Sequence, residues 1–469
     1  MANKPIRKPE EAAAVAHPDR ADPAAGGLNT LRVRGGLVTL RGLLQRPLAS
    51  YYLLLSCSGL LLVIGLVMVF SATSVDALGR TGNAYSPVVQ QGVGAVVGLG
   101  AFWWCQRLPV RTYRAMAPVG VWLAILSMFA VDALEFMARL RSDPDGVPRP
   151  LHLGPVYAQD RWLSFGSVQL QPSELGKLAL AVWAADVLAR KGKDIVAWRS
   201  LVFPLLPVTV LLLGLVGLND FGSMACLLVM VTGMLFVAGV HTRVFAVLFA
   251  GIAAGMVTLI AMPGKSYRVA RLTTFLDPSA ADRNGPAYQF FRGVYAIANG
   301  GWFGVGLGGG HLKWGHLPEA QNDFIFAVIA EELGVVGCFV VLALLATLTY
   351  TGLRIAARVD DTFRRLVATG IIFVIAGQAV INIGGVIGLM PITGVPLPFI
   401  SKGGTSLVAT LAAVGVLASF ARAEPAAAQV LHSRPPGRWE RLLWAPLPAL
   451  PAEPRTSTRG TAGQAVTRR

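Results

Sequence analysis

Charged residues are scarce in this sequence: Asp, Glu, Lys and Arg together make up 14% of its 469 residues. A soluble globular chain carries about 25% charged residues. Hydrophobic residues make up 54% of the chain, and this balance is typical of membrane proteins. The composition therefore argues against a soluble fold before any segment is inspected.

Cysteine is scarce too, and its placement excludes two further classes. The four cysteines lie in apolar runs, without the paired spacing of a zinc site or a disulfide framework: Cys57, Cys105, Cys226 and Cys338. We expect them to be small packing residues. The formal net charge is +16, but the basic residues are dispersed, and no aromatic-basic motif accompanies them. Positive loops beside an anionic lipid leaflet explain this charge better than a nucleic-acid partner.

Long apolar runs fill the middle of the chain. Residues 1–46 form a basic Ala/Pro/Gly-rich arm, and residues 423–469 form a Pro/Ala/Arg-rich tail; both compositions predict disorder. Residues 47–422 are predicted to be one all-α polytopic membrane domain. Its ten spans, each long enough for a hydrocarbon core of about 30 Å, lie near 51–72, 86–106, 112–133, 172–190, 201–218, 221–240, 243–262, 324–353, 364–389 and 402–421.

Lys and Arg in the short loops predict the orientation of these spans. The basic loops lie between spans two and three, four and five, six and seven, and eight and nine. They fall on one side together with both basic termini, so we expect that side to be cytoplasmic. The loops 134–171 and 263–323 and the stretch 390–401 then face outward. The largest of them lies between spans seven and eight.

Three polar stretches lie on the predicted outer side. The first, DRWLSFGSVQLQPSELGKLAL, places Ser173 as a helix N-cap and puts Glu174 and Lys177 on one helix face. Arg161 in this stretch is either an interfacial anchor or a site residue. The third, GVPLPFISKGGTS, breaks the helix at the outer face, as backbone lining a wet cavity does. Each stretch also has a purely structural interpretation. The first would be a helix cap with a local ion pair, and the third would be a re-entrant connector with no chemical role.

The second stretch, from Ser266 to Asp323, combines cations with Gly-rich turns. A long ordered loop of this kind is usually functional, and its aromatic and apolar residues favour packing on the membrane surface. Cations beside glycine backbone suit a phosphate or pyrophosphate group. The three stretches together predict a mostly cationic outward site with carboxylates. Such a site suits a negatively charged extracytoplasmic or lipid-linked substrate.

The segment LPEAQNDFIFAVIAEELG (317–334) places four carboxylates at or inside a membrane run. Glu319 and Asp323 stand at its mouth, and Glu331 and Glu332 lie further inside, where an unpaired charge is expensive. We expect the inner pair to hold helix contacts or line a polar cavity. A span beginning at Phe324 would make Asp323 its N-cap, where the helix dipole favours a charged carboxylate.

Five segments are similar, in the same order, to motifs of the SEDS (FtsW/RodA/SpoVE) family of cell-shape and division proteins: RWLSFGSVQLQPSELGK, FLDP, AYQ, GVGLGGGHLKWGHLPEAQNDFIFAVIAEELG and GVPLPFISKGGTS. The resemblance covers about residues 50–421 and is strongest to the division branch. It implies peptidoglycan glycosyltransferase activity on lipid II at the bacterial cytoplasmic membrane, at the division septum. The implied partners are a class B penicillin-binding protein and other division-complex membrane proteins.

The resemblance also implies roles for individual residues. The family's essential acidic residue falls on Asp323, as the general base for the acceptor hydroxyl or as a ligand of Mg²⁺ or Mn²⁺. No other cofactor is implied. The residues expected to bind substrate are Arg161, Glu174, Lys177, Arg268, Arg271, Lys313, Glu319, Ser401 and Lys402. The sequence departs from the family pattern at Arg292, Gly309, Gly310, Gln321 and Lys402.

Two other functions remain open from the sequence. A lipid II flippase predicts titratable residues along a path across the membrane midplane, whereas the polar stretches cluster on the outer side and favour an enzyme. A noncatalytic scaffold for the transpeptidase predicts that Asp323 is dispensable for polymerisation.

Overall fold

The computed structural model describes residues 42, 45–141, 156–159, 161–165, 168–192, 203–261, 274–277, 286–314, 317–433, 437 and 446–450. The chain divides into two compact units, Met1–Ala49 and Ser50–Arg469. In the first unit, the amide of Ala49 donates a hydrogen bond to the carbonyl of Arg46 (3.2 Å). The predicted disorder of residues 1–41 and 451–469 falls outside the described residues. All that follows concerns the second unit.

Each of the ten predicted spans coincides with a helix. The helices are α2 (Ala49–Thr81), α3 (Ser86–Cys105), α4 (Val110–Leu140), α5 (Pro172–Lys191), α7 (Leu205–Asn219), α8 (Phe221–Val237), α9 (Thr242–Ala261), α12 (Ile325–Arg358), α13 (Thr362–Val386) and α14 (Gly404–Arg422). Six of them, α2, α3, α4, α12, α13 and α14, are long and apolar enough to cross a membrane. The chain is therefore a polytopic helical membrane protein, and the count of ten spans stays a prediction.

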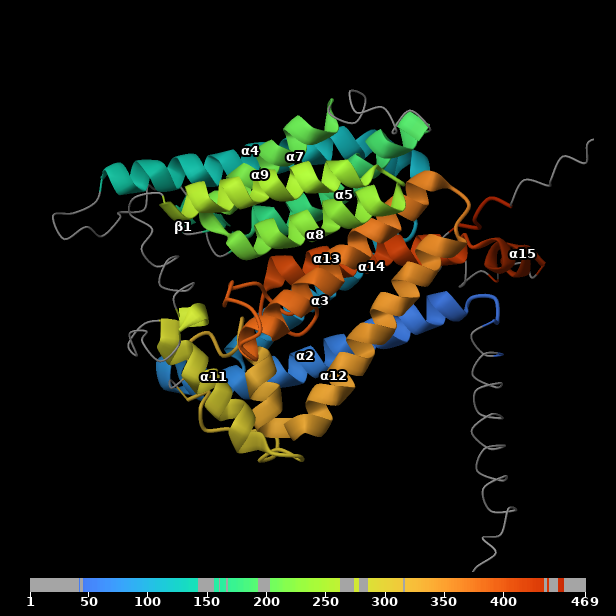
Figure 1. The fold of residues 1–469 in the computed structure, drawn as a ribbon. Coiled ribbons are helices and arrows are strands. Elements are labelled where there is room, and N and C mark those ends of the chain that lie inside the picture. The colour runs from blue at the N-terminus through green and yellow to red at the C-terminus, as the bar shows by residue number, and fades with distance from the viewer. Residues whose placement is uncertain are drawn as a thin grey trace, which may run out of the picture. The chain divides into compact units, whose positions relative to one another are not determined.

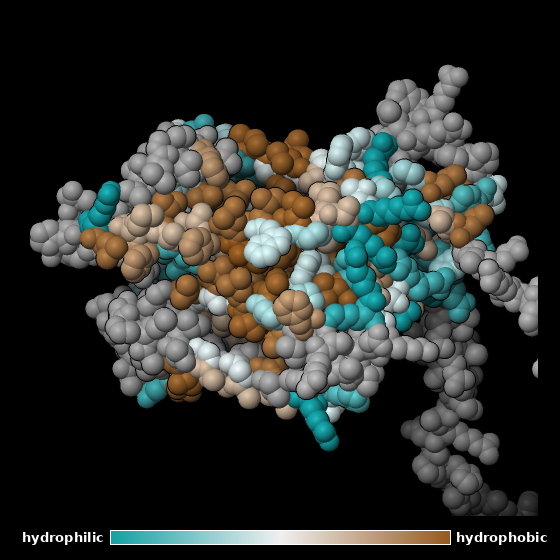
Figure 2. All heavy atoms as spheres, turned by 90° about the horizontal axis from the view of Figure 1, so that it is seen from above, coloured by the Kyte–Doolittle hydropathy of each residue, from teal (hydrophilic) through white to brown (hydrophobic). Residues whose placement is uncertain are grey.

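The most buried helices are α13 and α14, whose most apolar windows are 78% and 83% buried. Helix α13 packs against α8, α12 and α5, and α14 packs against α3 (Figure 1). The corresponding window of α3 is only 17% buried, which leaves its apolar side chains for lipid. Figure 2 shows a broad hydrophobic area on one face, with hydrophilic side chains gathered toward one end. This banding is typical of a protein that sits in a bilayer.

A small sheet corrects the all-α prediction. Strands β1 (Val156–Gln159), β2 (Trp162–Phe165) and β3 (Val168–Leu170) form an antiparallel sheet in the order β1-β2-β3. Ala158 and Leu163 pack against Val131 and Leu134 of α4, so the sheet is anchored to the helices. Gln159 pairs with Trp162, and Arg161 therefore lies at the hairpin turn between β1 and β2. The strands were missed because three or four residues are too few to show a period of two.

Helix α12 is bent, which corrects the prediction of one continuous helix over residues 324–353. At Gly334 the backbone takes φ 67° and ψ −166° inside the helix, and the ribbon of α12 changes direction along its length (Figure 1). Residues 325–333 thus form a short helical segment, and a long segment follows from residue 335; the candidate membrane span Ile325–Arg358 covers both. Glu331 and Glu332 lie at the bend, where the prediction had placed them inside one continuous span.

Two further helices lie outside the ten spans. Helix α11 (Pro286–Gly300) lies in the large loop before α12. Helix α15 (Pro425–Ser433) follows α14, so the prediction of a disordered tail from residue 423 is wrong over these nine residues. Its Ala427 and Ala428 are buried, and this packing explains why composition alone misjudged the segment.

Candidate active site

Asp323 lies just before α12 and is half-buried. The N-cap of α12 is Phe324, and no side chain caps it, so the prediction that Asp323 caps this helix is wrong. Instead, the peptide of Asp323 is held from another helix. The side-chain amide of Asn382, on α13, donates to the carbonyl of Asp323 and to the carbonyl of Val395, both at 2.8 Å.

The residues around Asp323 are fastened to residues 394–403, which we call the connector, between α13 and α14. The hydroxyl of Ser401 donates to the carbonyl of Asn322 (2.6 Å) and accepts from the amide of Leu397 (2.7 Å). The amide of Lys402 donates to the carbonyl of Gln321 (2.9 Å). Ser401 is buried, and its hydrogen bonds hold the backbone beside Asp323. Its contact with substrate stays a prediction.

Arg161 and Asp323 both approach Gly394 closely. Nη1 of Arg161 donates to the carbonyl of Gly394 (2.9 Å). A methyl group added at Gly394 would lie 3.1 Å from Nη2 of Arg161 and 3.2 Å from Oδ2 of Asp323. Gly394 has φ +78°, a left-handed conformation that favours glycine. The structure thus brings together the catalytic candidate, a predicted cation and the connector.

Asp220 completes the group and was missed from the sequence. Its Oδ2 pairs with Nη1 of Arg161 (3.2 Å). It is the N-cap of α8 and accepts from the amide (3.0 Å) and hydroxyl (2.8 Å) of Ser223. Gln171 adds an amide donor at 3.4 Å. The available signal was Asp220 three residues before Ser223 between two apolar runs, which reads as an ordinary helix cap.

Lys402 and Glu319 form a second charged group at the site. The negative charges of Glu319 and Asp76 both act on the Lys402 ammonium. Burial lowers the pKa of the Lys402 ammonium, and the two carboxylates act in the opposite direction. Glu319 has a left-handed backbone (φ 56°) and accepts a hydrogen bond from the Asn322 side chain. Both residues therefore belong to the loop and connector that hold Asp323.

Lys313 is engaged elsewhere. Its ammonium pairs with Glu332 and donates to the hydroxyl of Ser71 on α2 (2.9 Å). Lys313 and Glu332 are both buried. Glu331 accepts from the Asn299 side chain (3.2 Å) and from the His311 amide (3.0 Å). These contacts confirm the expected structural role of the two glutamates; the predicted role of Lys313 in substrate binding gains no support from them.

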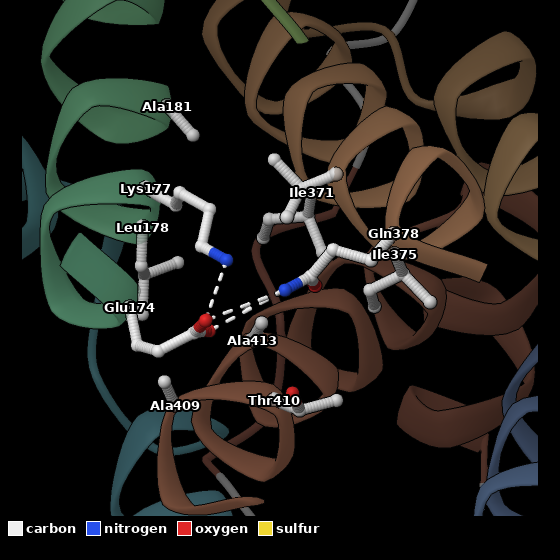
Figure 3. A pocket seen from close by; sticks show the side chains of 11 residues that line it. Glu174, Lys177, Leu178, Ala181, Ile371, Ile375, Gln378, Ala409, Thr410 and Ala413 are labelled. Atoms are coloured by element: carbon white, nitrogen blue, oxygen red, sulfur yellow. Dashed lines mark hydrogen bonds and ion pairs between the residues drawn. The ribbon is translucent and has the colours of Figure 1, made fainter. Parts of the chain in front are cut away.

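Glu174 and Lys177 form a buried pair in a separate pocket (Figure 3). Nζ of Lys177 lies 2.7 Å from Oε1 of Glu174, and the Gln378 side chain approaches both carboxylate oxygens at 3.5 Å. The surrounding walls come from α5, α13 and α14 and are mostly apolar. The N-cap of α5 is Gln171, with Pro172 in the first turn, so the prediction that Ser173 caps this helix is wrong.

Two sets of predictions remain without a structural test. Arg268 and Arg271 lie outside the described residues. Within the described part of the chain, no three His, Cys, Asp or Glu side chains gather as a metal site. If Asp323 holds Mg²⁺ or Mn²⁺, the remaining ligands would be water and substrate oxygens, as is usual for Mg²⁺ at phosphates.

Comparisons with known proteins agree with this architecture. A family model described as cell cycle protein, FtsW/RodA/SpoVE, matches residues 51–425. The chain is 37% identical over 406 residues to FtsW of Mycobacterium tuberculosis, covering 86% of this chain and 74% of the relative. It is 36% identical over 408 residues to FtsW of Aromatoleum aromaticum, covering 84% and 94%. Both relatives carry the name probable peptidoglycan glycosyltransferase.

Solved structures share the fold. One belongs to work on the structural coordination of polymerization and crosslinking by a peptidoglycan synthase complex; it has a TM-score of 0.60 and 26% identity and covers 79% of this chain and 96% of the other. The rod shape-determining protein RodA of Thermus thermophilus has a TM-score of 0.54 and 24% identity, with coverage of 79% and 96%. At 24% identity, the similarity to RodA supports the fold alone.

Proposed function

Because the chain belongs to the FtsW/RodA/SpoVE family, we propose that it is a peptidoglycan glycosyltransferase that polymerises lipid II on the outer face of the cytoplasmic membrane during cell division. Its relatives carry that activity in their names. The observation that carries the assignment of the site is the close approach of both Asp323 and Arg161 to Gly394.

The proposed reaction is a single displacement. Asp323 takes the proton of the acceptor sugar's 4-hydroxyl as that oxygen attacks the anomeric carbon of the donor. The bond from the anomeric carbon to the pyrophosphate oxygen breaks, and lipid pyrophosphate leaves with the electron pair. Inversion of the α-linked donor gives a β-1,4 bond without a covalent enzyme intermediate. Arg161 stabilises the charge that develops on the leaving group.

The proposed partners follow from chemistry and family. A glycan strand must be crosslinked after it is polymerised, and a solved relative comes from work on the coordination of these two activities in one complex. We therefore propose a class B penicillin-binding protein as the crosslinking partner. We also propose that the complex works at the division septum with other division proteins.

The flippase alternative has weaker support. A relay across the membrane needs titratable groups near the midplane. In α5 the charged pairs lie near the two ends: Glu174 with Lys177, and Asp186 with Arg190. The stretch LALAVWAA (178–185) between them has no titratable side chain. A noncatalytic scaffold remains the second alternative, and the same experiment tests it.

The deciding experiment compares wild type with Asp323→Asn in polymerisation of purified labelled lipid II, with the penicillin-binding partner present. Asn keeps the shape of the side chain and removes its charge. We expect a loss of at least about 100-fold, within the range that a general base contributes. Asp360→Asn is the matched control, because Asp360 is exposed in the turn after α12; it should polymerise like wild type.

Partner binding and folding are measured on the same samples. An Asp323→Asn variant that is folded, bound to its partner and inactive supports the enzyme. Equal polymer from both proteins would show that Asp323 is not catalytic and would favour the scaffold.

A further inference from the structure

The loop after α11 is unusually apolar and exposed. Residues 300–310 read GGWFGVGLGGG and contain no charged side chain. Trp302 is 73% exposed and Phe303 is 84% exposed, and Val305 and Leu307 are exposed as well. Exposed aromatic side chains that lie together mark an interaction site more often than single ones do.

The loop is built into the bend of α12. The amides of Val335 and Val336 donate to the carbonyls of Gly301 (3.0 Å) and Trp302 (3.2 Å). In the other direction, the amides of Val305 and Gly306 donate to the carbonyls of Glu331 (2.9 Å) and Glu332 (3.0 Å). The loop therefore pairs with both helical segments where α12 is interrupted, and Figure 1 shows it against the bend.

These bonds fix the loop beside a lipid-facing surface. The long segment of α12 begins with the exposed side chains of Val335, Val336 and Phe339. Because Val336 is bonded to Trp302 itself, the aromatic pair lies next to the point where this segment starts. The exposed apolar surface of the loop is thus adjacent to the surface that the span presents to lipid. Trp at such a boundary is typical of the membrane interface.

The backbone amides of Gly304, Val305, Gly306 and Gly309 in the loop are hydrogen-bonded within the protein. Polar backbone groups that enter hydrocarbon must be satisfied within the protein. Besides the donors named above, the amide of Gly304 bonds to the carbonyl of Gly300 (2.8 Å), and that of Gly309 bonds to the carbonyl of Gly306 (3.0 Å). The close packing of the loop against α12 requires glycine at position 304. Its φ is +77°, and an added methyl would lie 2.1 Å from the Glu332 carbonyl oxygen.

We propose that the loop 300–308 is a lipid anchor whose Trp302 and Phe303 side chains insert into the outer leaflet of the bilayer. Its partner is the lipid surface itself. The glycines serve this purpose by letting the loop backbone pair with α12, where the sequence had favoured a contact with phosphate. The anchor requires no catalytic step and stands independently of the proposed enzyme activity.

The test places a nitroxide spin label at the tip of the loop in the full chain. Phe303→Cys and, separately, Trp302→Cys are made after Cys105→Ala and Cys338→Ala, since Cys57 and Cys226 are buried. The proteins are reconstituted in nanodiscs of phosphatidylethanolamine and phosphatidylglycerol. Collision with oxygen, which enters lipid, is compared with collision with a water-soluble nickel chelate. Phe339→Cys on the span is the lipid control, and Ser433→Cys on exposed α15 is the water control.

We expect the ratio of oxygen to nickel collisions at 303 to be several-fold above that at 433 and close to that at 339. The labels at 302 and 303 should give similar collision ratios. A difference between them would show that one label disturbs the loop locally. A ratio at 303 equal to that at 433 would overturn the anchor and place the loop in water. Low access to both reagents would also overturn it, because the tip would then be covered by protein.

Discussion

The partners of Arg161 include groups of different kinds. Among them are the carbonyl of Gly394 and the carboxylate of Asp220, which is 3% exposed and fixed by Ser223. These contacts hold the guanidinium beside Gly394, which the carboxylate of Asp323 approaches as well. In this arrangement Asp220 is a positioning residue, because it acts through Arg161.

Asp220→Asn separates this positioning from helix capping. Asn caps a helix about as well as Asp, so α8 should still begin at Phe221; the melting temperature should fall moderately, because an amide nitrogen in place of Oδ2 cannot accept from Arg161 and Gln171. The ion pair with Arg161 is lost, and we expect polymerisation to fall by up to about 100-fold, the scale of a misplaced group in a reaction site. Asp361→Asn is the matched control: Asp361 also caps a helix and pairs with Arg114 and Arg364, and this change should leave the rate unaltered. Equal rates for wild type and Asp220→Asn would remove Asp220 from the site.

Lys402 predicts an alkaline limit to activity. Burial lowers the pKa of its ammonium, so it loses its proton at a lower pH than an ordinary lysine. If the ammonium binds the lipid pyrophosphate, initial rates of polymerisation should fall as pH rises through that lowered pKa. Lys402→Arg should move the limit to higher pH, because a guanidinium stays charged.

The effect of Lys402 on stability has the opposite dependence on pH from its effect on the polymerisation rate. The two effects can therefore be distinguished. With its pKa lowered in the folded state, Lys402 binds fewer protons there than in the unfolded chain. Between the two pKa values, its contribution to the free energy of unfolding therefore rises with pH. A rate that falls while the protein stays folded is thus a property of the site. An unchanged alkaline limit in Lys402→Arg would show that Lys402 does not set it.

At the scale of elements, the bend in α12 depends on one residue. The φ and ψ of Gly334 lie in a region that is essentially restricted to glycine and costs other residues about 1–3 kcal/mol. An added methyl would also lie 2.4 Å from the Gly304 nitrogen and 2.5 Å from the Trp302 carbonyl oxygen. Gly334→Ala should therefore lower the melting temperature clearly in detergent or nanodiscs.

Gly59→Ala is the control, because Gly59 is helical with open space around it and Ala favours a helix by up to about 1 kcal/mol. A Gly334→Ala protein as stable as wild type would mean that the bend is not strained against the loop.

This bend also shows where prediction from the sequence ended. The helices were predictable because hydrophobic runs are local signals. The interruption at Gly334 was not, because its partners, Gly301 and Trp302, are distant in sequence and act through their backbone. Glu331 and Glu332 were therefore placed inside one continuous helix, whereas they end the segment before the bend.

The site was predictable to a similar degree. Asp323 and Arg161 could be chosen by their chemistry and by resemblance. Asp220 and Asn382 could not, since one reads as a helix cap and the other as a lone polar residue in a span.

At the scale of the whole unit, the site must face outward if lipid II is polymerised there. Gln91, near the start of α3, donates to the carbonyl of Ser401 (3.3 Å) and accepts from the amide of Gly403 (3.2 Å). The turn before α3, which contains Asn83, is thus at the same end as the connector. Asp360, between α12 and α13, lies at the far end of the long segment of α12.

Cysteine labelling of whole cells tests this orientation. In the background without Cys105 and Cys338, we expect Asn83→Cys to react with a membrane-impermeant maleimide on intact cells, because the basic loops hold the opposite end in the cytoplasm. Asp360→Cys, also exposed, should react only after the cells are permeabilised. The two sites serve as controls for each other, since each is exposed in a turn between helices. The reverse pattern would put Asp323 and Arg161 on the cytoplasmic side, where the proposed polymerisation has no acceptor strand, and the outward assignment of the site would fall with it.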